Sequence, residues 1–186
     1  HTKSVLSVCK MSESTFLSAS EDNTIKMWNV NETTSLRTFE EHKNEVNSVC
    51  QMSESIFLSA GGNTIKMWNV NDTKSLRTFE GHIRLPPNVM SGKSVSSVCK
   101  MNESTFLSAG DNTIKMWDIN QTTSLRTFKE HANDVYSVCK MNDSTFLSAS
   151  YRNIKMWSVN DTKSLRTFEG HTTDVWSVCK MSKSTF

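Results

Sequence analysis

The sequence predicts an all-β chain built from one repeated unit, and two observations support this prediction. The phrase "FLSASEDNTIKMW", residues 16–28, returns as "FLSAGGNTIKMW", "FLSAGDNTIKMW" and "FLSASYRNIKMW". A period of about forty residues is typical of architectures whose units bury their apolar surface only by stacking on neighbours. In addition, no segment combines helical length with apolar residues three and four positions apart, so we do not expect helices to carry the fold.

Each unit begins at a histidine. This rule divides residues 1–186, which we expect to form one domain, into four complete units and one partial unit: 1–41, 42–81, 82–130, 131–170 and 171–186. The third unit is longer because an insertion, residues 83–91, follows its histidine. The chain starts without a methionine and stops part-way through a unit, so we expect a longer parent protein.

Four short segments in each unit have the composition of strands. In the first unit they are "SVLSVCKM" (4–11), "TFLSAS" (15–20), "TIKMWNV" (24–30) and "SLRTFEE" (35–41). They are rich in Val, Ile, Thr, Phe and Trp, and short polar stretches separate them, which predicts four strands joined by three hairpin turns. The residues that stay constant among units are expected in the core, whereas the variable turn between the second and third strands is expected at the surface.

The composition argues against two kinds of partner. Hydrophobic residues make up 36% of the chain, and no stretch is long enough to cross a bilayer, so we expect a soluble protein without a membrane partner. The 21 basic and 19 acidic side chains give a formal charge of only +2 and are spread evenly along the units. We therefore expect no nucleic-acid partner either.

The period, the four strands, the histidine before the first strand and the tryptophan that ends the third strand together resemble the WD-repeat β-propeller family. The resemblance covers the whole chain. It implies four complete four-stranded blades plus a partial fifth, arranged as an open arc of a larger propeller. Such an arc would leave an uncovered blade face and strand edge, so self-association through the open ends is expected.

The resemblance also implies a hydrogen-bonded set in each blade, made by the histidine, a serine on the second strand, an aspartate in the following turn and the tryptophan. The matching positions are His1, Ser18, Asp22, Trp28, His42, Ser59, Trp68, His82, Ser108, Asp111, Trp117, His131, Ser148 and Trp157. Gly62 and Arg152 stand where the aspartate is expected, so two sets should be incomplete. The insertion after His82 leaves open whether this histidine still reaches its set.

One cysteine occurs in each unit, always after a valine in "SVC": Cys9, Cys50, Cys99, Cys139 and Cys179. We expect these residues to pack inside the fold on the innermost strands. Because they lack the close C-x-x-C pairing of zinc sites and no unit contains two of them, neither a metal, another cofactor nor a disulfide framework is expected. Free thiols fit a reducing compartment, the cytoplasm or the nucleus.

One position varies far more than its neighbours. Between two fixed valines of the first strand, the residue changes from unit to unit: Leu6, Asn47, Ser96, Tyr136 and Trp176. In WD-repeat propellers this position, the residue two before it and the residue before the turn aspartate point toward one rim where partners dock. Carried over, the resemblance implies a partner-binding surface made by Asp134, Tyr136, Tyr151, Arg152, Asp174 and Trp176. The alternative is that Tyr136 and Trp176 fill gaps between blades.

The function that the resemblance implies is a non-catalytic scaffold for protein–protein interaction. A second interpretation stays open, namely an architectural array of repeats whose partner is another copy of itself. An enzyme is disfavoured because every candidate residue recurs in several copies, whereas a catalytic constellation is normally singular.

Overall fold

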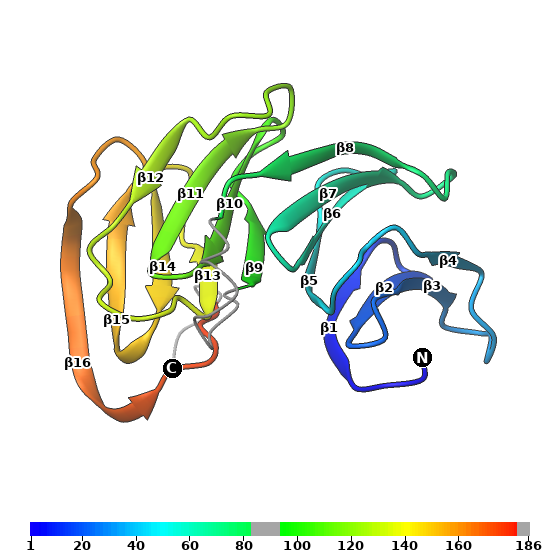
Figure 1. The fold of residues 1–186 in the computed structure, drawn as a ribbon, viewed down its shortest axis with the longest axis horizontal. Coiled ribbons are helices and arrows are strands. Elements are labelled where there is room, and N and C mark those ends of the chain that lie inside the picture. Colours follow the sequence, from blue (N-terminus) through cyan, green and yellow to red (C-terminus); the bar gives the residue numbers. More distant parts are fainter. Residues whose placement is uncertain (83–93, 182–186) are drawn as a thin grey trace.

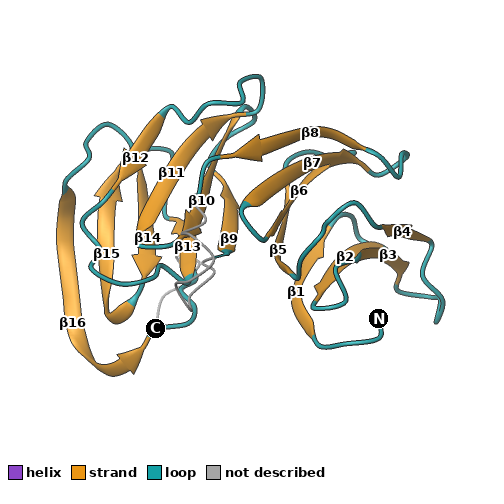
Figure 2. Ribbon diagram, in the orientation of Figure 1, coloured by secondary structure: helices purple, strands orange, loops and turns teal. Residues whose placement is uncertain are grey.

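The computed structural model describes residues 1–82 and 94–181, and the structural statements below concern these residues. Every regular element in them is a strand (Figure 2). The strands form four four-stranded antiparallel sheets, and within each sheet every strand pairs with the next one along the chain. The sheets follow one another along an open arch, with the first and the fourth sheet at its two feet (Figure 1). The predicted all-β, open architecture is thereby confirmed, while the insertion 83–91 lies outside the described residues.

The strands of the four sheets are, in chain order, β1 (Val5–Lys10), β2 (Thr15–Ser20), β3 (Ile25–Asn29) and β4 (Arg37–Phe39); β5 (Val46–Gln51), β6 (Ile56–Gly61), β7 (Thr64–Asn69) and β8 (Ser75–Glu80); β9 (Val95–Lys100), β10 (Thr105–Gly110), β11 (Thr113–Asp118) and β12 (Arg126–Phe128); β13 (Ser137–Lys140), β14 (Thr145–Ala149), β15 (Tyr151–Ser158) and β16 (Ser164–Asp174).

The repeated words of the sequence give the same strand register in every sheet. In the first sheet, Leu17 of β2 lies opposite Cys9 of β1 and Met27 of β3. In the second sheet, Leu58 lies between a cysteine and a methionine in the same way. Because side chains alternate between the two faces of a strand, an identical register places the same residue types on the same face of each sheet.

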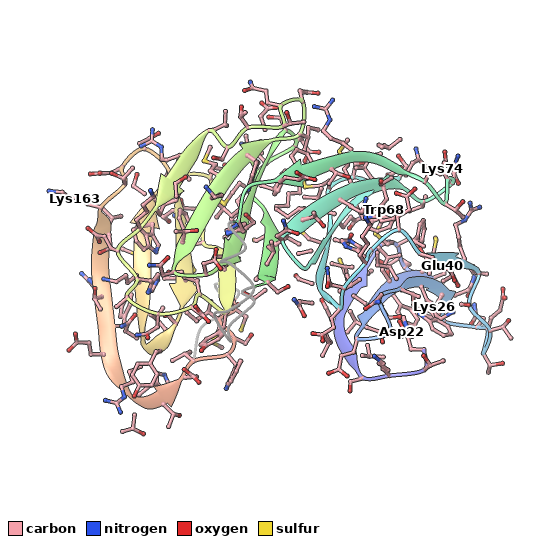
Figure 3. All side chains as sticks on the ribbon, in the orientation of Figure 1. Asp22, Lys26, Glu40, Trp68, Lys74 and Lys163 are labelled. Carbon is pink, nitrogen blue, oxygen red and sulfur yellow. The ribbon has the colours of Figure 1, made fainter. Side chains whose placement is uncertain are left out.

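The apolar core lies between neighbouring sheets. We call the side of a sheet that is turned toward the following sheet its forward face, and the opposite side its backward face. At the first junction, the forward face supplies Leu17, Ala19, Ile25 and Phe39, and the backward face of the second sheet supplies Val46, Val49, Phe57 and Trp68. Trp68 is visible between the two sheets in Figure 3. The other two junctions repeat this composition.

Aromatic rings at the outer part of each junction fix how the sheets approach each other. Phe39 meets Phe57 edge to face, with ring centroids 5.0 Å apart, and it meets Trp68 at 5.5 Å. Edge-to-face contacts of this kind add to the free energy gained by burying the rings. The same phenylalanine is buried in the first three sheets, and each fully buried large side chain contributes about 1.5–3 kcal/mol.

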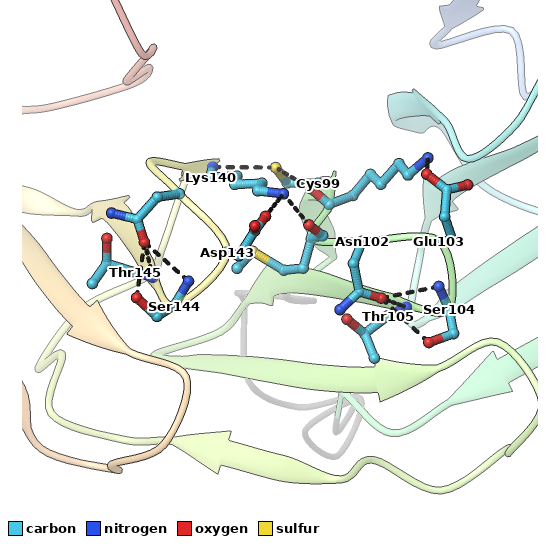
Figure 4. Close-up of polar contacts among 12 residues, drawn as sticks. Cys99, Asn102, Glu103, Ser104, Thr105, Lys140, Asp143, Ser144 and Thr145 are labelled. Atoms are coloured by element: carbon cyan, nitrogen blue, oxygen red, sulfur yellow. Dashed lines mark hydrogen bonds and ion pairs between the residues drawn. The ribbon is translucent and has the colours of Figure 1, made fainter.

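Hydrogen bonds connect the first strands of neighbouring sheets, which we call the inner strands (β1, β5, β9 and β13), across every junction. The serine hydroxyl of one sheet accepts the backbone N–H of a valine in the next, as Val98 N–H donates to Ser48 Oγ at 3.2 Å. Lys140 N–H donates to Cys99 Sγ at 3.4 Å, and the Lys140 ammonium donates to the Met101 carbonyl of the preceding sheet (Figure 4). Serine, valine and cysteine of "SVC" therefore all serve the junction, which explains why they do not vary.

The fourth sheet differs from the others at its outer strand. β16 runs to Asp174, beyond the predicted unit boundary at residue 170, so the partial unit 171–186 starts inside a strand of the fourth sheet. Residues 175–181 form no regular strand but lie against this sheet, where Val175 N–H donates to the Ser150 carbonyl at 3.1 Å. The described part of this unit offers no second strand for them to pair with, and Gly170–Asp174 instead prolong the ladder with β15.

The two ends of the arch leave apolar surface uncovered. On the backward face of the first sheet, Val5 is 52% exposed and Val8 is 66% exposed. On the forward face of the fourth sheet, Phe168 is 40% exposed, although its counterparts in the other sheets are at most 1% exposed. The packing of each sheet thus depends on a neighbour at both faces.

The different burial of the cysteines predicts that their thiols react at different rates. Burial raises the pKa of Cys50 to about 12, from an ordinary value of 9.0, whereas Cys179 is exposed. Because the thiolate is the reacting form, the buried Cys50 should be alkylated much more slowly than the exposed Cys179 in the folded protein. Peptide mapping after timed alkylation measures both rates. Similar alkylation rates for the two cysteines in the folded protein would contradict the burial of Cys50 on β5. The denatured chain is the control, because both cysteines should react at the same rate there.

Candidate functional site

The first sheet contains a continuous set of hydrogen bonds. The Trp28 indole N–H donates to Ser18 Oγ at 2.7 Å, and Ser18 Oγ lies 2.6 Å from His1 Nε2. The other ring nitrogen of the histidine, Nδ1, lies 2.9 Å from Asp22 Oδ2. The Asp22 carboxylate can only accept, so Nδ1 carries the proton that bonds it, and in a neutral imidazole Nε2 then accepts from the Ser18 hydroxyl. The serine oxygen in turn accepts from the Trp28 indole, which can only donate. Thr24 Oγ1 also donates to Asp22 Oδ1, at 2.7 Å.

The other three sheets contain the histidine, serine and tryptophan of this set. The His–Ser distances are 2.6, 2.7 and 2.6 Å and the Trp–Ser distances are 2.8, 2.8 and 2.7 Å, for His42–Ser59–Trp68, His82–Ser108–Trp117 and His131–Ser148–Trp157. His82 therefore reaches Ser108 in spite of the insertion that follows it. In this sheet Asp111 occupies the turn with a φ of 52°, and Thr113 Oγ1 lies 3.5 Å from His82 Nδ1.

In the two sheets that lack the aspartate, the turn is built differently. In the second sheet the backbone of Gly61 closes over His42, and a Cβ there would lie 2.6 Å from the Glu45 carbonyl oxygen, so only glycine fits. In the fourth sheet Arg152 adopts a positive φ of 62° and donates through Nε to the Thr172 carbonyl at 2.9 Å. Arg152 thus belongs to the surface of the turn.

Burial keeps the histidines of these sets neutral. It lowers the pKa of His42, His82 and His131 to about 4, and a nearby lysine on the third strand of each sheet adds to the shift. A neutral imidazole has one acceptor nitrogen, which is what the serine hydroxyl requires. The sets therefore act as structural locks at neutral pH, and their histidines are unsuited to donate or store protons there.

Two glutamates that were not predicted from the sequence connect neighbouring sheets. Glu41 accepts bonds from the backbone N–H of Ser75, at 3.1 Å, and from its hydroxyl. Glu130 accepts the same two bonds from Ser164, at 2.9 and 2.6 Å, and these bonds hold its pKa below the ordinary value. A signal was present in the sequence: both glutamates directly precede a histidine, where Gly81 and Gly170 precede the histidines of other units, and a serine follows each glutamate 34 residues later.

The six residues predicted to bind a partner lie together at one end of the fourth sheet. Tyr136 and Trp176 contact each other, with ring centroids 4.4 Å apart and a tilt of 36°. The Arg152 guanidinium lies over the Tyr151 ring, 4.5 Å from its centroid, and Asp174 pairs with Tyr151 across the ladder. Burial raises the pKa of Tyr136, and the negative charges of Asp174 and Asp134 add to this shift. We call these six residues the rim cluster.

The variable position has a role at the junctions as well. Asn47 Nδ2 donates to Ser94 Oγ of the next sheet at 2.7 Å, and Ser96 Oγ donates to the Val135 carbonyl at 2.6 Å. Tyr136 continues this pattern because it rests on Trp176 of the following unit. Trp176, in contrast, is 68% exposed. Tyr136 therefore contacts the following unit through the Trp176 ring, while most of the Trp176 side chain faces solvent.

The described residues were also searched for metal-binding groups and for membrane-spanning helices. Among residues 1–82 and 94–181, no three His, Cys, Asp or Glu side chains are grouped so that they could hold a metal ion. The same residues include no helix long and apolar enough to cross a membrane.

Stacked four-stranded meanders along an arc, each locked by histidine, serine and tryptophan, define a β-propeller built from repeats. The family model described as "WD domain, G-beta repeat" matches residues 1–29, 33–69, 73–118, 122–158 and 162–186. The chain therefore belongs to the WD-repeat family. No curated protein matches the sequence. The second matched repeat contains β4 of the first sheet and β5–β7 of the second, so each such repeat joins two neighbouring blades.

The hydrogen bonds of the lock predict that removal of its serine strongly lowers the free energy of unfolding. Ser59→Ala should destabilise the fold by about 2 kcal/mol or more, because the buried Trp68 N–H and His42 lose their shared partner. Ser55→Ala is the matched control, since the carbonyl rather than the side chain of this half-exposed turn residue accepts the Val70 N–H. Urea unfolding of both variants gives the two free energies. Equal stability of the two variants would contradict the role of the serine.

The buried histidines predict that the stability of the fold begins to fall at a higher pH than the pKa values of the carboxylates. A histidine whose folded pKa lies near 4 and whose unfolded value is 6.5 binds more protons when unfolded. Stability should therefore be complete above pH 6.5 and fall as the pH drops from 6.5 toward 4. The glutamates and aspartates with lowered pKa lose their contribution only below their ordinary values of 4.5 and 3.8. A melting temperature that stays constant from pH 6.5 to 5 would contradict neutral, buried histidines.

Proposed function

We propose that this protein is a non-catalytic scaffold that presents the rim cluster to a protein partner. WD-repeat proteins are generally scaffolds for protein interactions, and this general role applies to the chain as a member of the family. The observation that supports the rim cluster as the docking surface is the exposed Trp176, whose ring lies against Tyr136 beside an arginine and two aspartates.

The composition of the rim cluster suits an interface. Aromatic residues and arginine carry a large share of the binding energy in protein interfaces, and they do so best when a neighbouring side chain holds them in place. Tyr136 supports Trp176 in this way, and Tyr151 supports Arg152. The cluster also occupies positions where the copies of the unit differ, so these side chains can change without disturbing the shared core.

The family is typically non-catalytic, and the locks support the same assignment here. The buried histidines and serines recur in all four sheets and bond each other in the same way, which uses their hydrogen-bonding capacity for structure. The free thiols support a reducing location, and we expect the partner in the cytoplasm or the nucleus.

The rim cluster predicts different effects for its two large aromatic residues. Trp176→Ala should weaken binding of the partner by about 2 kcal/mol and leave stability almost unchanged, because most of the indole faces solvent. Tyr136→Ala should weaken binding and also lower the melting temperature, since Tyr136 contacts the following unit. Affinity capture with the chain as bait, followed by calorimetry on the captured protein, measures the affinities.

Leu76→Ala serves as the control for this comparison, because Leu76 is an exposed apolar residue on β8, far from the rim cluster along the chain. The control should bind the partner like the parent chain. Unchanged affinity of Trp176→Ala, or an equal loss in the control, would refute the rim cluster as the docking surface.

A further inference from the structure

The three junctions between neighbouring sheets differ at the residue that directly precedes the histidine. Glu41 occupies this position at the first junction and Glu130 at the third, whereas Gly81 occupies it at the second. The second junction joins the second and third sheets, which lie inside the arch with a neighbouring sheet at both faces (Figure 1). The difference between the junctions therefore concerns complete blades.

Each glutamate is bound by a serine of the fourth strand and lies near a lysine of the third strand. Glu41 accepts from the N–H and the hydroxyl of Ser75, and Lys66 Nζ lies 3.6 Å from Glu41 Oε2. Lys66 also donates to Ser75 Oγ, at 3.4 Å. Glu130 accepts the same two bonds from Ser164; these bonds, and then the charge of a lysine on β15, lower its pKa. A serine and a lysine thus form a carboxylate-binding group at two junctions.

The third sheet contains the same donors, with Ser124 just before β12 and Lys115 on β11. Within the described part of the chain, neither the N–H nor the hydroxyl of the half-buried Ser124 has a hydrogen-bond partner. The Lys115 ammonium donates to Thr127 Oγ1 at 3.2 Å, as its counterparts do to the equivalent threonines. The carboxylate-binding group is therefore present at the second junction, where the glutamate is replaced by Gly81.

The charges near this group differ from those at the other junctions and favour an acidic ligand. Lys129 occupies a position that is acidic in the other three complete units, where the residues are Glu40, Glu80 and Glu169. Burial, and then the positive charge of Lys129, lowers the pKa of Lys115, while Asp111 in the turn of the same sheet opposes this shift. Two positions that are acidic elsewhere are thus neutral or basic here.

The residues at and around position 81 are unsuited to supply the carboxylate. A Cβ on Gly81 would lie 2.8 Å from Trp117 Cη2, so a glutamate at this position would collide with the indole ring. The preceding residue, Glu80, lies opposite Thr64 in the ladder of the second sheet. Residues 83–93, "IRLPPNVMSGK", contain no acidic residue. We therefore expect the carboxylate to come from another molecule.

The fourth strand of the third sheet is also shorter than its counterparts that carry a bound glutamate. β8 begins at Ser75 and β16 at Ser164, and each serine pairs with the tryptophan of the third strand. The ladder of β12 ends at the pair of Met116 and Arg126. An aspartate in the turns before β8 and β16 also bonds the backbone, so the turn and the glutamate both fix these strand starts. A carboxylate bound to Ser124 should hold this residue closer to β11.

We propose that Ser124 and Lys115, assisted by the charge of Lys129, bind a glutamate side chain of a protein partner. Ser124 donates its N–H and its hydroxyl to the carboxylate, and Lys115 supplies the positive charge. The occupant is a glutamate because the same donors bind a glutamate at both other junctions. This site contains no residue of the rim cluster, so it is a second site that stands or fails independently of the docking surface proposed above.

An NMR titration of the isotope-labelled chain tests the proposal, with the peptide acetyl-Gly-Glu-Gly-amide as the probe. The amide resonance of Ser124 should shift and reach saturation, and its hydrogen exchange should become slower, because the carboxylate accepts this N–H. The peptide acetyl-Gly-Gln-Gly-amide, which has the same shape without the charge, should have no such effect. The amides of Ser75 and Ser164 are internal controls and should not respond, since Glu41 and Glu130 already accept them.

Three variants identify the donors. Lys115→Met should weaken binding of the glutamate peptide at Ser124 by about tenfold, because the charge that attracts the carboxylate is lost. Lys66→Met is the matched control at the equivalent position of the second sheet, and it should leave the titration of Ser124 unchanged. Glu41→Ala should give the Ser75 amide a new response to the peptide, because it releases the same donors there. The amide spectrum of each variant verifies that it is folded.

Four results would overturn the proposal. One is a Ser124 amide that responds to the glutamate peptide no more than Ser75 and Ser164 do. Another is an equal response to the glutamine peptide, since that result shows contact without recognition of the carboxylate. The third is an unchanged affinity in the folded Lys115→Met variant. The fourth is tighter binding of inorganic phosphate than of the glutamate peptide, which would identify a site for a free anion instead of a side chain of a partner.

Discussion

The structure depends on one constraint: a sheet of this composition must have a neighbour at both faces. Each sheet carries valine, phenylalanine and tryptophan on its backward face and leucine, alanine, isoleucine and phenylalanine on its forward face. A single four-stranded meander leaves one of these surfaces in water, and small isolated sheets are marginal. Stacking removes both surfaces from water at once, and a repeated sequence makes every junction the same. The residues that the units share at the junctions are thus those that the packing requires.

The hydrogen-bonded locks solve a problem that this packing creates. Burying an indole and an imidazole removes two polar groups from water, and an unpartnered buried donor costs about 1–3 kcal/mol. One serine hydroxyl satisfies both, because it accepts from the tryptophan and donates to the histidine. The aspartate of the first sheet adds a partner for the outer ring nitrogen, Nδ1. The second and fourth sheets lack this aspartate but keep the bonds among histidine, serine and tryptophan, so these bonds do not depend on the aspartate.

A core shared by all units limits where an individual unit can acquire its own function. The residue between the two valines of the inner strand lies at the rim of a junction, so it can vary as long as it reaches the next sheet. Asn47 and Ser96 reach it with short hydrogen bonds, and Tyr136 reaches it with a ring. The same side chain can therefore stabilise a junction and shape the surface above it, and the two interpretations of Tyr136 from the sequence do not exclude each other.

The sequence alone determined the all-β class and the repeated unit, because strand composition, turns and the forty-residue period are local or periodic properties of the chain, whereas the residues of the locks were implied by resemblance to the family. The residues of the rim cluster were named by resemblance to the family; their grouping is seen in the structure, while binding stays a prediction. Only the tertiary structure decided that His82 reaches Ser108, that Glu41 and Glu130 hold the following blade, and that β16 continues to Asp174. Those features depend on distances between residues that are far apart in the chain and on which sheet packs against which. The sequence of a single unit contains no information on either.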